Sequence, residues 1–362
     1  MKTLFFTLLS VLFLSEAFAL NDRYFARSPK GLLMGDAYTS IADDEYTLYY
    51  NPAILARNKG LSFWAINPSI TASNPLDKED RFGETGDTTS EFTDNFFNFP
   101  LHVGVNGAPG FKLGGFGLTA VLNHQTNFTL QNQFTPMLDI DHHYDRGFIA
   151  GYAAPLTKDL ALGVSVKYIQ RESVFGTYNL VSPRVLDAIA AEEFEDVLDA
   201  FGRTNGSGWG VDLGLDYVKV KKNQMFTAGF ALIDAYTLLH TDSNEEDREV
   251  QTQPLKANFG ASYTIKGKIL GFKVSSDIRN LEDSEMSFKK RFKLGTELIL
   301  SPALSALAGV NSGQYSYGIK LNLGILQTYA GFYGVDIGEE VGQQTSNRAV
   351  LYVSLFDFNY EI

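Results

Sequence analysis

The chain has 362 residues, a formal net charge of -12 and no cysteine. The absence of cysteine excludes disulfides and thiol chemistry, and the acidic balance argues against binding to nucleic acid or attraction to anionic lipid head groups. Aromatic residues make up 13% of the chain, and 33 glycines are many for a soluble domain. The length suits a large soluble core or a large membrane barrel equally well.

Residues 1–19 have the pattern of a cleaved signal peptide, which predicts an exported protein. Lys2 supplies the positive charge, an apolar run of about a dozen residues follows, and Ala17-Phe18-Ala19 matches an A-x-A cleavage site. The apolar run is too short for a membrane-spanning helix, so an N-terminal anchor is the less favoured alternative. No later stretch approaches the ~20 apolar residues that a spanning helix needs.

Residues 20–59 are too irregular for a strand and too broken for a long helix. Paired glycines permit tight backbone turns, and paired aspartates can cap a turn or a short helix. An asparagine before proline is held extended, and its side chain can bond local backbone groups. We therefore predict a compact plug inside a polar lumen, with the structural motif residues Gly31, Gly35, Asp36, Asp43, Asp44, Asn51, Pro52 and Ala53.

The predicted plug also carries apolar side chains that a purely polar plug would not need. Two interpretations stay open: these side chains pack against one another, or they form a pocket for a hydrophobic ligand. The candidate ligand-binding residues are Leu32, Leu33, Met34, Tyr49 and Tyr50.

From Leu61 onward the chain alternates with a period of two, which predicts strands with two distinct faces. In the stretch 160–168, the even positions are large and apolar, whereas the odd positions are small or charged. A soluble sandwich turns its apolar face inward, and a membrane barrel turns it outward, so the alternation alone does not separate them. The fourteen candidate strands are roughly 61–67, 99–106, 111–124, 144–155, 159–172, 208–219, 224–237, 253–265, 268–279, 290–300, 304–310, 315–323, 325–334 and 347–362.

The connections between these strands favour an outer-membrane barrel. Such barrels have an even number of strands, short turns at one rim and long loops at the other. The last strand alternates to the end of the chain and finishes in aromatic and apolar residues, which resembles a barrel assembly signal. The expected short turns are 107–110, 156–158, 220–223, 266–267 and 301–303, and the expected long loops are 68–98, 125–143, 173–207, 238–252, 280–289 and 335–346.

One long loop contains a predicted amphipathic helix near 183–201. Ser182-Pro183 provides an N-cap and a proline at the first helical position, and Gly202 ends the helix. Its place in a long loop predicts that it lies outside the cell. Either it packs on the rim for stability, or it forms an apolar gate or landing groove.

The sequence contains no motif for catalysis, and no cofactor or metal is expected. His142-His143 lies beside three aspartates, but adjacent residues on a strand point to opposite faces. The acidic loops 68–98 and 242–249 lack the spacing of a calcium loop and are interpreted as solvated faces. We therefore do not expect an enzyme.

The run from Gly31 to Ala53, especially Ala42-Asp43-Asp44 and Asn51-Pro52-Ala53, resembles the N-terminal region of the FadL-like outer-membrane barrels. The resemblance implies an all-β, antiparallel transmembrane barrel of about 14 strands at 60–362, with the plug at 20–59 in its lumen. It also implies passive transport of hydrophobic compounds, such as long-chain fatty acids, in the outer membrane of a Gram-negative-type bacterium.

The segment Gly208–Leu215 and the tail from Phe292 are more similar to the PorV-like branch of that superfamily. That branch implies a different function, namely a scaffold or secretion partner without transport activity. The partners expected across the two alternatives are outer-membrane lipid, a hydrophobic small molecule and other outer-membrane or secreted proteins. A general aqueous porin is less favoured, because a plug leaves little open channel.

Overall fold

The computed structural model describes residues 25–74, 99–131, 136–180, 182–183, 185, 194–243, 249–267, 270–338 and 341–361. The predicted signal peptide at 1–19 lies outside these ranges, as does much of the predicted loop helix. Within the described residues, no helix is long and apolar enough to cross a membrane.

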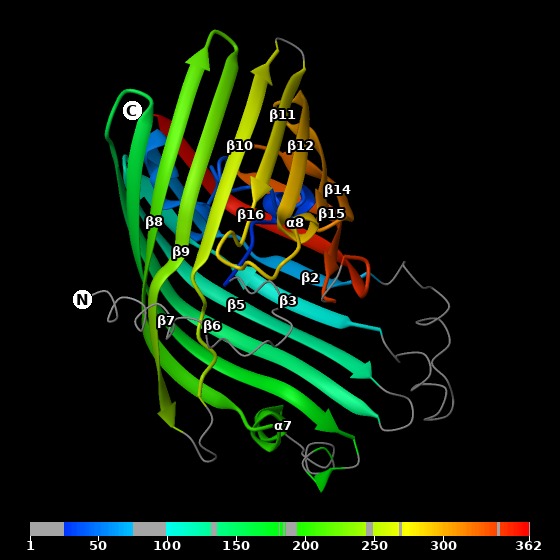
Figure 1. Ribbon diagram of the computed structural model, residues 1–362. Coiled ribbons are helices and arrows are strands. Elements are labelled where there is room, and N and C mark those ends of the chain that lie inside the picture. The colour runs from blue at the N-terminus through cyan, green and yellow to red at the C-terminus, as the bar shows by residue number, and fades with distance from the viewer. Residues whose placement is uncertain are drawn as a thin grey trace, which may run out of the picture.

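Sixteen strand segments form one antiparallel sheet that closes on itself (Figure 1). Closure comes from the pairing of the first segment with the last and of the fifth with the sixth. The segments are β1 (Gly60–Ile66), β2 (Ser69–Ser73), β3 (Leu101–Gly107), β4 (Gly110–Leu113), β5 (Phe116–Gln131), β6 (Met137–Pro155), β7 (Leu160–Asn179), β8 (Thr204–Lys221), β9 (Gln224–Ser243), β10 (Lys256–Lys266), β11 (Gly271–Ile278), β12 (Phe292–Ser301), β13 (Leu304–Asn311), β14 (Gln314–Asn322), β15 (Leu326–Asp336) and β16 (Thr345–Glu361).

Two pairs of segments are each one strand interrupted by a break. β1 and β2 pair in succession along β16, and β4 and β3 pair in succession along β5. The wall is therefore a closed barrel of fourteen strands, which confirms the predicted fold class.

The structure corrects the predicted turn at 107–110. The hairpin between β4 and β5 turns at Gly114-Gly115, and 107–110 is a break inside a strand. Pro109 explains the break, because proline has no N–H to donate to the neighbouring strand. The predicted loop 125–143 is also wrong over most of its length, since β5 continues to Gln131 and β6 starts at Met137. Polar side chains on both faces hide the alternation there.

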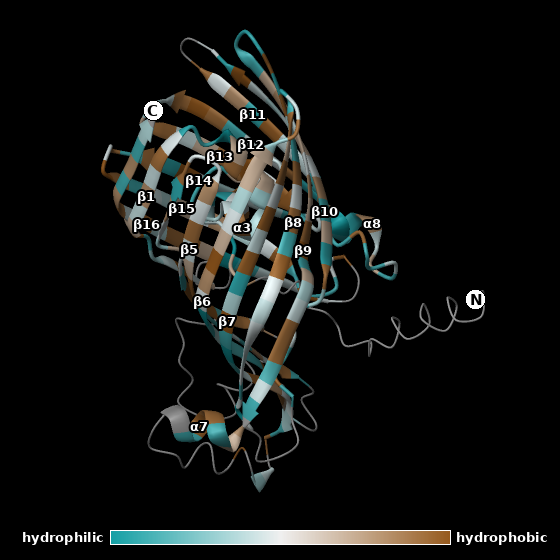
Figure 2. Cartoon of the chain, turned by 90° about the vertical axis from the view of Figure 1, so that its left-hand side faces the viewer, coloured by the Kyte–Doolittle hydropathy of each residue, from teal (hydrophilic) through white to brown (hydrophobic). Residues whose placement is uncertain are grey.

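The apolar side chains of the strands face outward, as expected for a barrel in lipid. On β7, Val164 and Val166 are 41% and 42% exposed, whereas Ser165 and Lys167 are each 1% exposed. Figure 2 shows this as alternating brown and teal along the strands. The burial pattern settles the ambiguity of the sequence, because a soluble sandwich would bury the valines.

The barrel wall is taller on one side than on the other. Strands β5–β9 have 16 to 20 residues, whereas β11–β14 have 8 to 10. A four-residue helix, α8 (Phe288–Arg291), directly precedes β12 on the short side of the wall. Short turns join the strands at the rim where β16 ends, and most of the longer connections lie at the other rim, as predicted.

The described part of the predicted loop helix is α7 (Phe194–Ala200), at the end of the tall wall (Figure 1). Leu198 and the following Phe201 are buried against Val174 and Tyr178 of β7. These two β7 residues share a face with the outward Tyr168, because residues two apart on a strand point the same way. The helix therefore covers the outer surface of the wall extension, and its contacts match the rim-packing interpretation.

Candidate functional site

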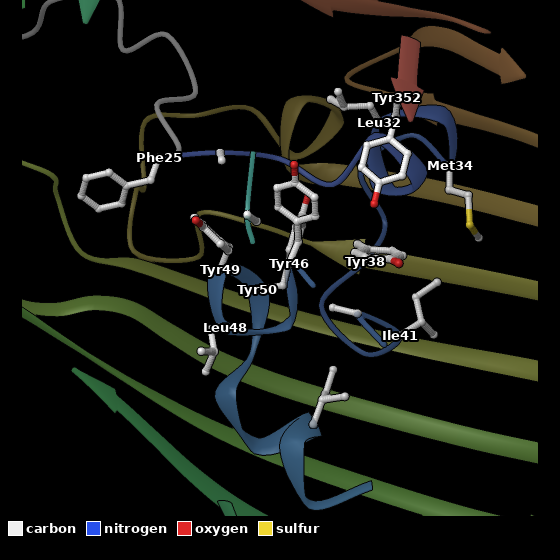
Figure 3. Close-up of a cluster of buried hydrophobic side chains, with 14 of the residues drawn as sticks. Phe25, Leu32, Met34, Tyr38, Ile41, Tyr46, Leu48, Tyr49, Tyr50 and Tyr352 are labelled. Atoms are coloured by element: carbon white, nitrogen blue, oxygen red, sulfur yellow. The ribbon is translucent and has the colours of Figure 1, made fainter. Parts of the chain in front are cut away.

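Residues 25–59, called the lumen segment from here on, occupy the interior of the barrel. The segment contains α2 (Pro29–Leu33), α3 (Thr47–Tyr50) and the 3-10 helix η2 (Pro52–Arg57). η2 contacts β6, β7 and β8, while α2 contacts β13–β16 on the opposite wall. One buried cluster joins side chains of the segment to side chains of the strands (Figure 3).

The sequence explains the tight start of the segment. Ser28 caps α2 by accepting a hydrogen bond from the Gly31 N–H at 3.2 Å, and Pro29 occupies the first turn. Gly35 then adopts φ +62°, and a Cβ there would meet the backbone of Val310. Glycine is required at this position both by the left-handed conformation and by the close approach to β13.

The predicted motif residue Asp36 is the centre of a buried ionic contact. Its carboxylate pairs with Arg279, which follows β11, and both side chains have no exposed surface. Tyr50 donates its hydroxyl to Asp36 at 2.7 Å, and Arg27 lies 3.8 Å away. The contact joins residues 243 positions apart, so the lumen segment is tied to a distant strand.

The two motif aspartates that follow have different roles. Asp44 accepts hydrogen bonds from the hydroxyls of Ser28 at 2.6 Å and Tyr38 at 2.7 Å, so it closes the segment on itself. Asp43 lies 3.5 Å from Lys30 and 3.8 Å from Lys273 of β11, and these contacts tie the segment to the wall. Burial acts against the charge of Lys30, but Asp43 and Glu297 outweigh it and hold its pKa well above the ordinary value.

Asn51-Pro52-Ala53 fits into a socket of glycines on the wall. The Asn51 side chain accepts from the Ala53 N–H at 3.0 Å and donates to the Leu215 carbonyl of β8 at 3.0 Å. A Cβ on Gly214 would overlap the Asn51 side-chain oxygen, and a Cβ on Gly163 would overlap the Ala53 backbone. Sequence reasoning predicted small lumen-facing residues, but it did not identify them as the socket for this motif.

The predicted ligand-binding residues are packed in this structure. Leu33 and Met34 have no exposed surface, and Leu33 packs against Gly318 and Gly331 of the wall. Tyr49 and Tyr50 use their hydroxyls within the interior (Figure 3). Leu32 borders a cavity near the rim. Ligand binding by these five residues remains a prediction.

Two neighbouring strands break at the same height of the barrel. β1 and β2 are interrupted at Asn67-Pro68, and β3 and β4 are interrupted at Ala108-Pro109. The Asn67 amide bridges the gap by donating to the Ala108 carbonyl and accepting from the Ala108 N–H, both at 2.9 Å. A side chain therefore replaces strand pairing at this place, which we call the wall break.

The lumen segment lies directly behind the wall break. Tyr49 donates its hydroxyl to the Ala120 carbonyl of β5 at 3.1 Å, and Tyr46 donates to the Asn106 side chain of β3. Their rings are 5.5 Å apart. On the outer side, an almost entirely apolar hollow is lined by Pro109, Gly110, Phe111, Leu118, Ala120 and Phe148.

Glu45 adds a titratable contact next to these tyrosines. One oxygen of its carboxyl group accepts a hydrogen bond from the Tyr352 hydroxyl of β16. The second oxygen has no hydrogen-bond partner among the described residues. Burial, reinforced by the nearby Asp44 charge, raises the pKa of Glu45 to about 8. The carboxyl is therefore favoured in its neutral form at neutral pH.

A second hollow, a small cavity of about 70 Å³, lies between the lumen segment and the rim opposite the C-terminus. Its wall residues come from β2, β3 and β5, from the start of β6, and from the end of β15 and the start of β16. Unlike the hollow at the wall break, it mixes charged, amide and apolar side chains. We call it the rim cavity.

No protein-family model and no curated protein matches the chain. Among solved structures, the toluene transporter TodX of Pseudomonas putida matches with a TM-score of 0.54 and 13% identity, over 93% of this chain and 100% of TodX. A second structure of that transporter matches with a TM-score of 0.51 and 12% identity, over 94% and 100%. The toluene transporter TbuX of Ralstonia pickettii matches at 0.49 and 11% identity, over 93% and 100%.

At these identities the matches show a shared fold. The chain shares the barrel fold of TodX, which agrees with the fold that the resemblance between Gly31 and Ala53 implied.

Proposed function

We propose that this protein is an outer-membrane channel that carries hydrophobic compounds, long-chain fatty acids among them, by a sideways path through its wall. The observation that carries the proposal is the wall break, which has aromatic side chains of the lumen segment behind it and an apolar hollow in front of it. TodX, which shares this fold, is a toluene transporter, and this supports the class of cargo.

A sideways path suits an apolar cargo for a physical reason. A molecule that leaves a barrel through the open end of its lumen enters water. A molecule that leaves through the wall enters lipid and stays out of water. Exposed Ile66 and Ile70 flank the break on the outer surface, so the exit meets the apolar band of the barrel.

The lumen segment acts in this proposal as a movable plug. Tyr46 and Tyr49 contact the wall beside the break, so a shift of α3 withdraws both rings from it. The Asn67 bridge is then the last bonded group across the gap. Cargo binding near the apolar residues of the plug supplies the shift, which gives the predicted pocket residues Leu32, Leu33, Met34, Tyr49 and Tyr50 their role.

The test fills the outer hollow without touching the interior. Ala120 lines the hollow on β5, and Ala150 on β6 faces the same outer surface without lining it. We expect Ala120→Trp to reduce uptake of a radiolabelled alkyl compound into vesicles by about tenfold or more, because the ring blocks the exit. Ala150→Trp is the matched control and should transport as the unchanged protein does.

Equal uptake by the two folded variants would contradict the sideways path. If the unchanged protein transports no apolar compound and instead purifies from native membranes with a protein bound in fixed ratio, the scaffold alternative replaces transport.

A further inference from the structure

The rim where β16 ends carries a group of five lysines on three neighbouring hairpins. All five side chains are exposed, and within the described part of the chain none of them forms an ion pair. The five, which we call the basic arc, are Lys158 in the β6–β7 turn, Lys219 and Lys221 at the end of β8, Lys222 in the β8–β9 turn and Lys266 at the end of β10.

The three hairpins stand side by side at the upper rim in Figure 1. The Val218 N–H of β8 donates to the Asp159 carbonyl of the first hairpin at 2.8 Å, and the Lys266 N–H donates to the Asn223 carbonyl of the second at 2.8 Å. The lysines therefore form one continuous stretch of positive charge. Asp159 is the one acidic side chain on the described residues of these turns.

The net charge of the chain hides this arc. A balance of -12 argues against attraction to anionic lipid head groups for the chain as a whole. The acidic loops, however, join β2 to β3 and β9 to β10, and these strand ends lie at the opposite rim. β8 separates the rims by 18 residues, whereas salt screens charges beyond about 8 Å, so the arc acts through its local charge.

The lysines at the end of β8 continue the lipid-facing row of the barrel. Leu213 and Leu215 are exposed on the outer surface, and residues two apart on a strand point the same way. Tyr217, Lys219 and Lys221 are the next members of that row. The row thus passes from apolar side chains through an aromatic ring to two amines, as expected where a barrel leaves the hydrocarbon and meets lipid head groups.

Aromatic rings mark the same level on the neighbouring strands. Phe226 of β9 lies opposite Lys219 of β8, and Tyr263 of β10 lies opposite Phe226. The rings of Tyr217 and Phe226 are 6.4 Å apart in an edge-to-face arrangement. Rings of this kind lie at the level of the head groups in membranes. The amines beside them therefore face head groups, which distinguishes the arc from a basic patch that meets only water.

Apolar side chains project between the lysines in the turns. Val220 is 65% exposed between Lys219 and Lys221, and Leu156 and Leu270 are more than half exposed in the first and third hairpins. A surface that mixes amines with exposed apolar side chains suits a phospholipid, because the amines meet the phosphate and the apolar groups meet the upper part of the acyl chains.

We propose that the basic arc binds the head groups of anionic phospholipids in the leaflet that meets the short-turn rim. In outer-membrane barrels this is the periplasmic leaflet, since their short turns face the periplasm. Each amine near a membrane surface favours an acidic lipid by about fivefold, and the phosphate accepts hydrogen bonds from it. The bound lipids hold the β6–β11 side of the barrel at a fixed depth. This binding rests on the membrane location in the proposed function and not on transport.

The experiment places a reporter ring beside the arc. Phe226→Trp puts a tryptophan on the outer surface opposite Lys219, and Trp64→Phe with Trp209→Phe removes the two native tryptophans. This reporter protein is the full chain, reconstituted into phosphatidylcholine vesicles with a minor share of either brominated phosphatidylglycerol or brominated phosphatidylcholine. Bromine quenches only nearby tryptophan, so the two quenching levels report which lipid is enriched there. We expect phosphatidylglycerol to be enriched about fivefold or more, and less at high salt.

Charge-matched variants of the reporter protein locate the preference. Lys219→Gln together with Lys221→Gln removes the two outward amines and should leave an enrichment of about twofold or less. Arg146→Gln together with Lys289→Gln is the matched control, because it also removes two exposed positive charges, both toward the opposite rim. It should be quenched as the reporter protein is. Heat-dependent gel mobility checks that each barrel is folded, and the comparison of the two lipids needs no lysine variant.

The outcomes decide between lipid and other partners of the arc. Equal quenching of the reporter protein by the two lipids overturns the proposal. A preference for phosphatidylglycerol that survives the double lysine variant overturns its assignment to the arc. Soluble polyaspartate that binds the reporter protein but not the double lysine variant, with no lipid preference in either, replaces the lipid by an acidic protein partner.

The same measurements separate the arc from the transport proposal. Enrichment of phosphatidylglycerol around a protein that takes up no apolar compound supports the arc and rejects transport. Uptake without enrichment rejects the arc and leaves transport standing. Quenching by neither lipid places the reporter ring outside the membrane and overturns the location that both proposals need.

Discussion

The two sides of the lumen segment are held to the wall by different chemistry. On the side of β8 and β11, Asp36 pairs with Arg279, and Arg57 pairs with Asp216 at 2.7 Å through its Nε. On the side of the wall break, Tyr46 and Tyr49 each donate one hydrogen bond through the hydroxyl group. The Lys112 amine there donates a hydrogen bond to the Thr47 hydroxyl at 2.6 Å. We call these the anchored side and the break side.

The difference suggests where the segment moves. Buried ion pairs and the glycine socket fix position at short range, and either one is costly to disrupt. A tyrosine hydroxyl bonded to a carbonyl contributes only about 1 kcal/mol. We therefore expect a segment attached in this way to pivot about its anchored side and to leave the break side first.

The largest effect should come from the anchored side, when half of its buried ion pair is removed. Arg279→Met leaves the Asp36 carboxylate buried without its closest cation, which should cost about 3–5 kcal/mol in the free energy of unfolding. Urea titration followed by gel mobility measures the loss. Arg203→Met is the control, because Arg203 pairs with the exposed Asp199 and such surface pairs contribute about 0–1 kcal/mol. Equal losses in the two variants would contradict the comparison.

A smaller effect is expected at the glycine socket. Gly214→Ala places a methyl group against the Asn51 side chain, and overpacking of this kind costs about 1–3 kcal/mol. Gly107→Ala is the matched control, since the nearest atom to its added Cβ would be 3.6 Å away. The melting temperature should fall for Gly214→Ala and change little for Gly107→Ala. A melting temperature that Gly214→Ala leaves unchanged would mean that Asn51 can shift freely in its socket.

The smallest effect on stability should occur on the break side, where it should instead change transport. Tyr49→Phe removes the bond to Ala120 and should weaken this side by about 1 kcal/mol, which speeds uptake of an apolar compound by about fivefold. Tyr50→Phe is the paired control, because that hydroxyl bonds Asp36 on the anchored side. It should lower stability without faster uptake. Faster uptake in Tyr50→Phe alone would reverse the assignment of the two sides.

Part of this architecture was predictable from local patterns. The alternation of Val164 and Val166 with Ser165 and Lys167 predicted two-faced strands, and the turn and loop lengths predicted a barrel. The predicted strand count is confirmed even though several boundaries were wrong. In particular, the break at Pro109 was taken for a turn, and the true turn at Gly114-Gly115 was placed inside a strand. Local sequence does not distinguish a proline in a turn between two strands from a proline at a break inside one strand.

The partners within the candidate site were not predictable in the same way. Local sequence identified Asn51-Pro52-Ala53 as a turn with a bonding asparagine, yet it did not identify the Gly163 and Gly214 socket. Local sequence identified the five apolar residues of the lumen segment as candidates, but it did not reveal their packing against distant strands. Such pairs are set by the register of strands far along the chain, which a single sequence does not reveal.

The sequence by itself determined that the chain forms two-faced strands and where the motifs of the lumen segment lie, because period-two alternation, turn residues and capping residues act over a few positions. Only the tertiary structure decided which way the apolar face points, that Asn67 bridges Ala108, and that Gly163 and Gly214 form the socket of Asn51-Pro52-Ala53. The physical reason is that closure of the sheet brings together side chains from strands that are remote in sequence, and burial and unpaired charge exist only once they have met.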